Sequence, residues 1–237
     1  MSLSSPADVP RGVAGARQLS LFGVAAADPT PGDLAGLLAG PGTISRMGGT
    51  VRVSIDVAHA WRVHVLVAEL RQRGLTPTWQ ERADGGLVVR TAYTAALARL
   101  GAAWLHPTAT PEAADPTAEP GADAEPADAE PADAEPDDDR LVKRPPVGFH
   151  LAGQRLRLWA AAAGTRDPLG YRLRLGESDA GNWSQTGAAL AAIGLPAVLL
   201  DSRSGGPAYR IVGRRRLTRL AELLGDRPAA APPDGWV

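Results

Sequence analysis

Arginine is the residue whose type and placement point to a chemistry in this sequence. Two segments, Thr50–Asp56 and Tyr171–Leu175, alternate apolar with polar or basic residues, as β-strands with one buried face do. With the hairpins that follow them, they would present outward Arg52, Ser54, Thr78, Gln80, Arg82 and Arg90 from the first half, and Arg172, Arg174, Arg203 and Arg210 from the second. A planar guanidinium binds phosphate and guanine through two parallel hydrogen bonds, so these faces fit a nucleic acid.

A further cluster, Arg214, Arg215 and Arg216, begins a predicted helix over residues 213–225. Cations at the amino end of a helix oppose its macrodipole, and a polyanionic partner would compensate for that cost. The alternative is a solvated basic surface without a partner, because high-GC coding by itself favours Arg.

The sequence offers no residues for enzyme chemistry. Cys is absent, which removes thiolate nucleophiles and ligands and indicates a reducing compartment. His59 and His64 are five residues apart on one predicted helix, so they point about 140° apart around its axis and fit a shared metal poorly. No phosphate-binding glycine loop or His-Glu metal motif occurs. We expect no catalytic residue, no metal site and no cofactor.

The peptide Gln18-Leu19-Ser20-Leu21-Phe22 stands in an otherwise polar N-terminal tail. Its Gln amide can both donate and accept hydrogen bonds, and its Leu and Leu-Phe side chains can fill apolar pockets. It resembles, at all five positions, the Gln-Leu-Ser/Asp-Leu-Phe peptide with which bacterial proteins dock on the β sliding clamp of DNA polymerase III. The resemblance implies that clamp as a partner. Alternatively, Leu19, Leu21 and Phe22 pack as a short strand onto the folded part.

The formal net charge of −1 conceals an uneven distribution. Residues 107–139 hold 12 of the 26 acidic residues and no basic one, and they contain Ala-Asp-Ala-Glu-Pro three times. Such a segment cannot bury enough apolar surface to order, so we expect a disordered linker. It acts as a solubilising spacer or, alternatively, as a nucleic-acid mimic. The flanking parts are basic: 8 basic against 4 acidic residues in 34–106, and 15 against 6 in 140–227.

The two flanking parts share the same spacing of glycine pairs. Gly74-Leu75 precedes Gly85-Gly86 by eleven residues, and Gly194-Leu195 precedes Gly205-Gly206 by eleven. A helix-like stretch precedes each Gly-Leu pair, strand-like flanks surround each Gly-Gly pair, and a closing helix follows. The expected helices span residues 58–73, 178–193, 93–103 and 213–225. This pattern predicts an α+β fold of two tandem repeats, each with the order α-β-β-α-β-β-α.

The segment Leu34-Ala35-Gly36-Leu37-Leu38-Ala39-Gly40-Pro41-Gly42 resembles the nonapeptide that names the LAGLIDADG homing-endonuclease family. The resemblance implies that motif helices of two repeats pack through small residues, and that two sheets form a pseudo-two-fold saddle on double-stranded DNA. It also implies a metal-binding acidic residue at the eighth position. Here the sixth and eighth positions are Ala39 and Pro41, and the second segment, Leu156–Gly164, has Ala161 and Ala163 there. We therefore expect no metal-dependent cleavage. The alternative is a plain apolar helix.

These observations divide the chain into five parts: a disordered tail with the clamp-binding peptide (1–30), a first LAGLIDADG-like repeat (31–106), a linker (107–139), a second repeat (140–227) and a disordered tail (228–237). No apolar stretch is long enough to span a membrane and no signal peptide is recognisable, so we expect a cytoplasmic, nucleoid-associated protein. Because both repeats lie in one chain, we expect a monomer.

The sequence predicts a non-catalytic double-stranded-DNA-binding accessory protein that the sliding clamp recruits to replication or repair. Three alternatives stay open. The first is a protein-interaction adaptor of the replisome, and the second is a transcriptional or developmental regulator with a degenerate homing-endonuclease fold. The third is a nuclease that uses Asp167, Glu177 and Asp179.

Overall fold

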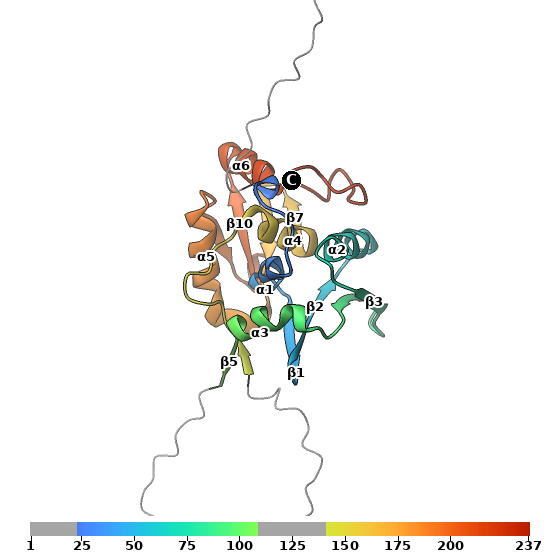
Figure 1. The fold of residues 1–237 in the computed structure, drawn as a ribbon. Coiled ribbons are helices and arrows are strands. Elements are labelled where there is room, and N and C mark those ends of the chain that lie inside the picture. The colour runs from blue at the N-terminus through green and yellow to red at the C-terminus, as the bar shows by residue number, and fades with distance from the viewer. Residues whose placement is uncertain (1–22, 109–140) are drawn as a thin grey trace, which may run out of the picture.

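The computed structural model describes residues 23–108 and 141–237. Over these residues the protein is a mixed α+β fold with antiparallel sheets, which confirms the coarse fold prediction. Figure 1 shows two helices, α1 (Ala35–Ala39) and α4 (Gly153–Ala163), at the centre of the molecule, with sheet and helix on either side of them. The peptide Gln18–Phe22 and nearly all of the acidic segment lie outside the described residues.

The first half of the chain forms a four-stranded antiparallel sheet, called sheet 1 here, in the order β1-β2-β4-β3. Its elements follow one another as η2 (Pro31–Leu34), α1, β1 (Thr43–Met47), β2 (Thr50–Val57), α2 (Ala60–Gln72), β3 (Pro77–Glu81), β4 (Leu87–Thr91), η3 (Ala95–Leu97) and α3 (Ala98–Trp104).

The second half forms another four-stranded antiparallel sheet, sheet 2, in the order β7-β8-β10-β9. Its elements are α4, β7 (Gly164–Asp167), β8 (Gly170–Arg174), η5 (Glu177–Asn182), α5 (Trp183–Ala192), β9 (Val198–Leu200), η6 (Ser202–Ser204), β10 (Ala208–Val212) and α6 (Arg214–Leu224). Between the halves, β5 (Leu105–Pro107) pairs antiparallel with β6 (Leu141–Lys143), which brings Pro107 opposite Leu141.

Local sequence patterns explain these elements. In β2, Val51, Val53 and Ile55 alternate with outward residues, and each is only 2% exposed. Helices α2 and α5 end in the same way: Gly74 and Gly194 adopt positive φ angles of 70° and 82°. In both, the residue after the glycine donates its N–H to a carbonyl five residues earlier, which satisfies the helix end.

Small residues allow α1 and α4 to approach closely. A β-carbon added at Gly36 would lie 1.8 Å from the Arg155 carbonyl oxygen, and one at Gly40 would lie 2.4 Å from the Trp159 ring. Helix α1 spans only five residues, shorter than the expected segment, and α4 begins at Gly153, three residues before the expected second segment. The apolar side chains of both helices enter one core that also takes in both sheets.

A buried arginine of the first half caps α4 of the second. Arg62, on α2, donates hydrogen bonds to the carbonyls of Ala160 at 3.2 Å and Ala161 at 2.8 Å, and a further one to Gly164. These carbonyls lie at the carboxyl end of α4, where a helix carries partial negative charge and lacks internal donors. Burial lowers the pKa of Arg62, and the neighbouring charge of Arg174 acts in the same direction.

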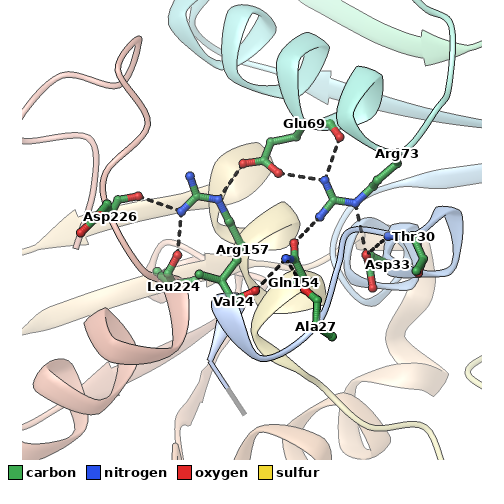
Figure 2. A network of polar contacts seen from close by, with 10 residues as sticks. All are labelled: Val24, Ala27, Thr30, Asp33, Glu69, Arg73, Gln154, Arg157, Leu224 and Asp226. Carbon is green, nitrogen blue, oxygen red and sulfur yellow. Dashed lines mark hydrogen bonds and ion pairs between the residues drawn. The ribbon is translucent and has the colours of Figure 1, made fainter. Parts of the chain in front are cut away.

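A second buried arginine, Arg73, joins the halves through the polar network in Figure 2. Its guanidinium donates to Glu69 Oε2 at 2.8 Å and to Gln154 Oε1 at 2.7 Å, and its Nε lies 3.3 Å from Asp33 Oδ2. Because the Arg73 side chain is fully buried, these partners are what make its charge tolerable there. Glu69 also accepts from Arg157 Nε at 2.6 Å, so the carboxyl end of α2 is joined to α4 by two contacts, Glu69–Arg157 and Arg73–Gln154.

The prediction of disorder was wrong for part of the N-terminal tail and for the C-terminal tail, because both segments pack on α4. Residues 23–30 were expected to be disordered, yet Gln154 Nε2 donates to the carbonyls of Val24 at 2.7 Å and Ala27 at 3.1 Å. Residues 228–237 were also expected to be disordered, yet Trp236 is 2% exposed and belongs to the core. Neither segment has a periodic pattern, and contacts with residues distant in the sequence place it on α4.

None of the described helices has both the length and the apolar character needed to cross a membrane.

Candidate nucleic-acid interface

The outer face of each sheet is the face whose side chains point away from the helices and the core. On sheet 1, strand pairing places Thr43, Ser54, Arg90 and Thr78 side by side in one row across β1, β2, β4 and β3. Arg52 stands on the same face of β2, opposite Ser45 of β1. Four of the predicted outward residues of the first half are therefore neighbours on one surface, and Arg90 is half-buried and forms no ion pair in the described chain.

Arg52 is held by an aromatic ring rather than by a carboxylate. Its guanidinium carbon lies 4.4 Å from the centre of the Tyr93 ring, a cation–π arrangement that leaves the positive charge uncompensated. The Tyr93 hydroxyl is 3.2 Å from Ser45 Oγ, which fixes the ring over the sheet. Sequence reasoning missed Tyr93, because it follows the end of β4 and only its position beside Arg52 gives it a role.

The far end of sheet 1 is electrostatically mixed. Gln80 is exposed on β3 and shares its row with Val88 and Asp56. Arg82 was expected on the strand but lies just after it, where its guanidinium is 3.2 Å from Asp56 Oδ1 and 3.6 Å from Asp84 Oδ2. Two carboxylates therefore offset the charge of Arg82 in the free protein.

On sheet 2, Arg172 of β8 and Arg210 of β10 stand directly opposite each other. Both approach the same carboxylate: Asp167 Oδ2 lies 2.8 Å from Arg210 Nε and 3.2 Å from Arg172 Nε. Arg174, on the same face, is exposed and without an ion-pair partner among the described residues.

Asp167 remains ionised because its stabilising contacts outweigh its burial. Burial alone would raise the pKa of this carboxyl, but the Leu169 N–H, which donates to Oδ1 at 2.7 Å, and the two arginines hold the pKa below its usual range. The Asp167 side chain is only 3% exposed. The sequence suggests only a nuclease ligand at this position, and the pairing of Asp167 with two outward arginines is a finding of the structure.

Besides Arg82, four more of the predicted arginines do not lie on a strand. Arg203 is exposed in η6, in the connection between β9 and β10, because β9 already ends at Leu200. Arg214, Arg215 and Arg216 are exposed in the first turn of α6. Arg214 and Asp167 nevertheless line one pocket of about 560 Å³, so the start of α6 adjoins the end of sheet 2.

The acidic residues of the nuclease alternative do not form a metal site. Across residues 23–108 and 141–237, no group of three His, Asp or Glu side chains could hold a metal ion. Asp167 is engaged by arginines, and Asp179 Oδ2 lies 2.5 Å from Lys143 Nζ. Lys143 also donates to the Gly42 carbonyl at 2.6 Å, and burial lowers its pKa against the opposing effect of Asp179.

Neither the available protein-family models nor the curated proteins contain a match to this chain.

Proposed function

We propose that this chain is a non-catalytic protein that binds double-stranded DNA, and that the peptide Gln18–Phe22 docks it on the β sliding clamp of DNA polymerase III. The observation that carries the DNA-binding proposal is the presence of arginines on the outer faces of both sheets, Arg52 and Arg90 on one and Arg172, Arg174 and Arg210 on the other. Arg90 and Arg174 have no acidic partner in the described chain, so phosphate oxygens are suitable acceptors for them.

The proposed fold family is LAGLIDADG-like, with two repeats related by a pseudo-two-fold axis and a saddle formed by the two sheets. Three features support this reading. Each half has the order α-β-β-α-β-β-α, the two sheets have equivalent strand orders, and the two motif-bearing helices pack through Gly36. The non-catalytic part rests on the residues at the two motif ends, where Ala39, Pro41, Ala161 and Ala163 provide no carboxylate for a metal.

DNA binding is tested by titrating a labelled 30-base-pair duplex with the full chain at several salt concentrations. We expect binding that weakens steeply with salt, because each neutralised phosphate releases counterions. The double variant Arg90→Ala/Arg174→Ala should bind more weakly and lower the log–log salt slope by about 2, since two phosphate contacts are lost. The matched control is Arg71→Ala/Arg99→Ala, which removes two exposed arginines of α2 and α3.

Two results would reject this proposal. If the chain fails to retard duplex DNA even at low salt, the adaptor alternative replaces it. If both double variants lose the same affinity, binding follows net charge instead of the outer faces, and the proposed surface is wrong.

Clamp docking is tested separately by capture of purified β clamp on the immobilised full chain. Leu21→Ala/Phe22→Ala should abolish capture, because the two apolar anchors are removed. Ser20→Asp is the control, since that position accepts either Ser or Asp in the peptide that this segment resembles. Capture that survives the double change, or is lost with Ser20→Asp, would contradict the assignment.

A further inference from the structure

The Asp167–Arg172–Arg210 cluster is rigid in a way that the other outward arginines are not. Asp167 accepts a hydrogen bond from the Leu169 N–H on Oδ1 and one from Arg210 Nε on Oδ2, and Arg172 Nε lies 3.2 Å from the same Oδ2 as an ion pair. Residues Arg172 and Arg210 belong to the two central strands of sheet 2, so their main chains are held by the sheet as well. Both ends of each side chain therefore have defined positions.

Because Arg210 contacts Asp167 through Nε, the edge of its guanidinium that carries the two Nη atoms is available to a ligand. A guanidinium has five N–H donors, and an Nε contact uses one of them, so the four donors on the two Nη atoms remain. Within the described chain no acceptor contacts the Nη atoms of Arg210, whose side chain is 21% exposed. Arg172 has fewer donors left, since its Nη1 also donates to the Gly205 carbonyl at 3.4 Å. Of the two arginines, Arg210 therefore has more N–H donors available to a ligand.

The charge balance of the cluster favours selective recognition of a base over binding to phosphate. Two arginines share one carboxylate, so the cluster attracts phosphate less than two free arginines would. Guanine, in contrast, presents O6 and N7 as paired acceptors that match the Nη edge of an oriented arginine. An arginine that is already oriented loses less conformational entropy on binding. Arg174, which lacks such a tether, suits a phosphate.

We infer that Arg210 reads a guanine in the major groove, and that Asp167 is the positioning residue that orients it. This inference rests on the proposed binding of double-stranded DNA and adds which base that surface selects. Removing Asp167 should have two opposite effects. The loss of a negative charge should strengthen binding to any duplex, while the loss of orientation should weaken the preference for guanine.

The test starts with selection of duplexes from a random-sequence pool by the full chain. A guanine at one selected position is then replaced by 7-deazaguanine, which lacks the N7 acceptor, and affinities for the two duplexes are compared. For the unaltered chain we expect the replacement to weaken binding roughly 5-fold or more, because it removes one of the two acceptors of an arginine–guanine pair that as a whole is worth roughly 5- to 150-fold. Arg210→Lys, which keeps the charge but not the planar fork, should bring the affinities for the two duplexes closer together.

Two further variants separate orientation from charge. Arg174→Ala should weaken binding to both duplexes by the same factor and leave their ratio unchanged. Asp167→Asn should tighten binding to the 7-deazaguanine duplex and bring the ratio of the two affinities, guanine duplex over 7-deazaguanine duplex, closer to one. A cluster that serves only to hold the sheet together would lower both affinities in parallel.

The inference is overturned if selection yields no position at which 7-deazaguanine weakens binding, or if Arg210→Lys keeps the full ratio. In either case, salt-dependent duplex binding would persist and the proposed function would stand. If no duplex binds at all, or if only single-stranded RNA or an acidic protein is retained, the proposed function and this inference both fail.

Discussion

Gly36 touches the main chain of Arg155 so closely that a β-carbon at residue 36 would lie 1.8 Å from the Arg155 carbonyl oxygen. Backbone atoms cannot move aside as a flexible side chain can, so Gly36→Ala must push α1 and α4 apart. We expect a loss of about 3 kcal/mol or more in the free energy of unfolding, at the upper end of over-packing costs. Gly49→Ala is the control, because nothing lies within 4 Å of the added atom. Urea denaturation of both variants measures the difference, and equal stabilities would refute the close packing.

Trp236 is 2% exposed, and the guanidinium carbon of Arg157 lies 5.4 Å from the centre of its ring. Trp236→Ala should lower the free energy of unfolding by about 3–5 kcal/mol, because it leaves a cavity in the core. Asp234→Ala, at an exposed position of the same segment, should change it little. If thermal denaturation shows both variants as stable as the unaltered chain, residues 228–237 are a tail after all.

The burial of Trp236 shows what the sequence could and could not predict about the fold. The strand over 50–57 was placed within one residue and the helix over 60–72 within two, because alternation and helical spacing are local patterns. The packing of Val24 and Trp236 was missed because it depends on α4 side chains that lie more than a hundred residues from Val24 and almost eighty from Trp236.

The candidate site was predictable to a similar degree. Alternation correctly put Arg52 with Ser54, and Arg172 with Arg174, on one face of their strands. The partner across the sheet was not predictable, since a helix and another strand separate β2 from β4 and β8 from β10 in the chain. In sheet 1 the second of the two outward residues of β2, Ser54, pairs with Arg90. In sheet 2 the first of the two outward residues of β8, Arg172, pairs with Arg210, so the register of the two sheets differs by two residues. This register sets Arg172 opposite Arg210, both of which approach Asp167, and no pattern within one strand indicates it.

Arg62 contributes to stability through the end of α4. Arg62→Met keeps an apolar stem but removes the donors to the carbonyls of Ala160, Ala161 and Gly164. Leaving buried carbonyls without donors should cost about 2–3 kcal/mol. Arg71→Met, on the exposed side of the same helix, is the control. Chemical denaturation should show a clear loss for Arg62→Met alone, and equal effects of the two changes would contradict the capping role.

Tyr171 has a fully buried hydroxyl without a hydrogen-bond partner among the described residues, whereas the Tyr209 hydroxyl donates to the Trp183 carbonyl at 2.6 Å. Tyr171→Phe should therefore cost nothing or stabilise the protein by up to about 1 kcal/mol, while Tyr209→Phe should cost about 1 kcal/mol. Equilibrium unfolding at pH 7 compares the two. A loss for Tyr171→Phe as large as that for Tyr209→Phe would indicate a partner for the first hydroxyl.

Tyr171 also predicts a pH dependence. Burial raises the pKa of its hydroxyl well above the ordinary value of about 10, against the opposing effects of Arg62 and Arg166. The unfolded chain then releases this proton near pH 10 while the folded chain keeps it, so stability is full below pH 10 and falls as the pH rises above it. Tyr171→Phe should lose less stability than the unaltered chain between pH 9 and pH 11. Parallel losses in unfolding titrations would count against the raised pKa.

The pairing of Pro107 with Leu141 allows a direct test of the acidic segment. Because β5 and β6 already lie side by side, Asn-Gly can replace residues 109–140 and form, with Thr108, a three-residue loop that leaves the described fold intact. The replacement removes twelve acidic residues and one arginine, and so changes the formal net charge from −1 to +10. We expect an unchanged melting temperature and tighter low-salt binding to duplex DNA, because repulsion between the chain and the phosphates is removed.

A full-length control with the twelve acidic residues changed to Asn or Gln should bind like the shortened chain if charge is the cause. Should it bind like the unaltered protein, length is responsible, and should neither variant bind more tightly, the acidic charge does not oppose DNA binding.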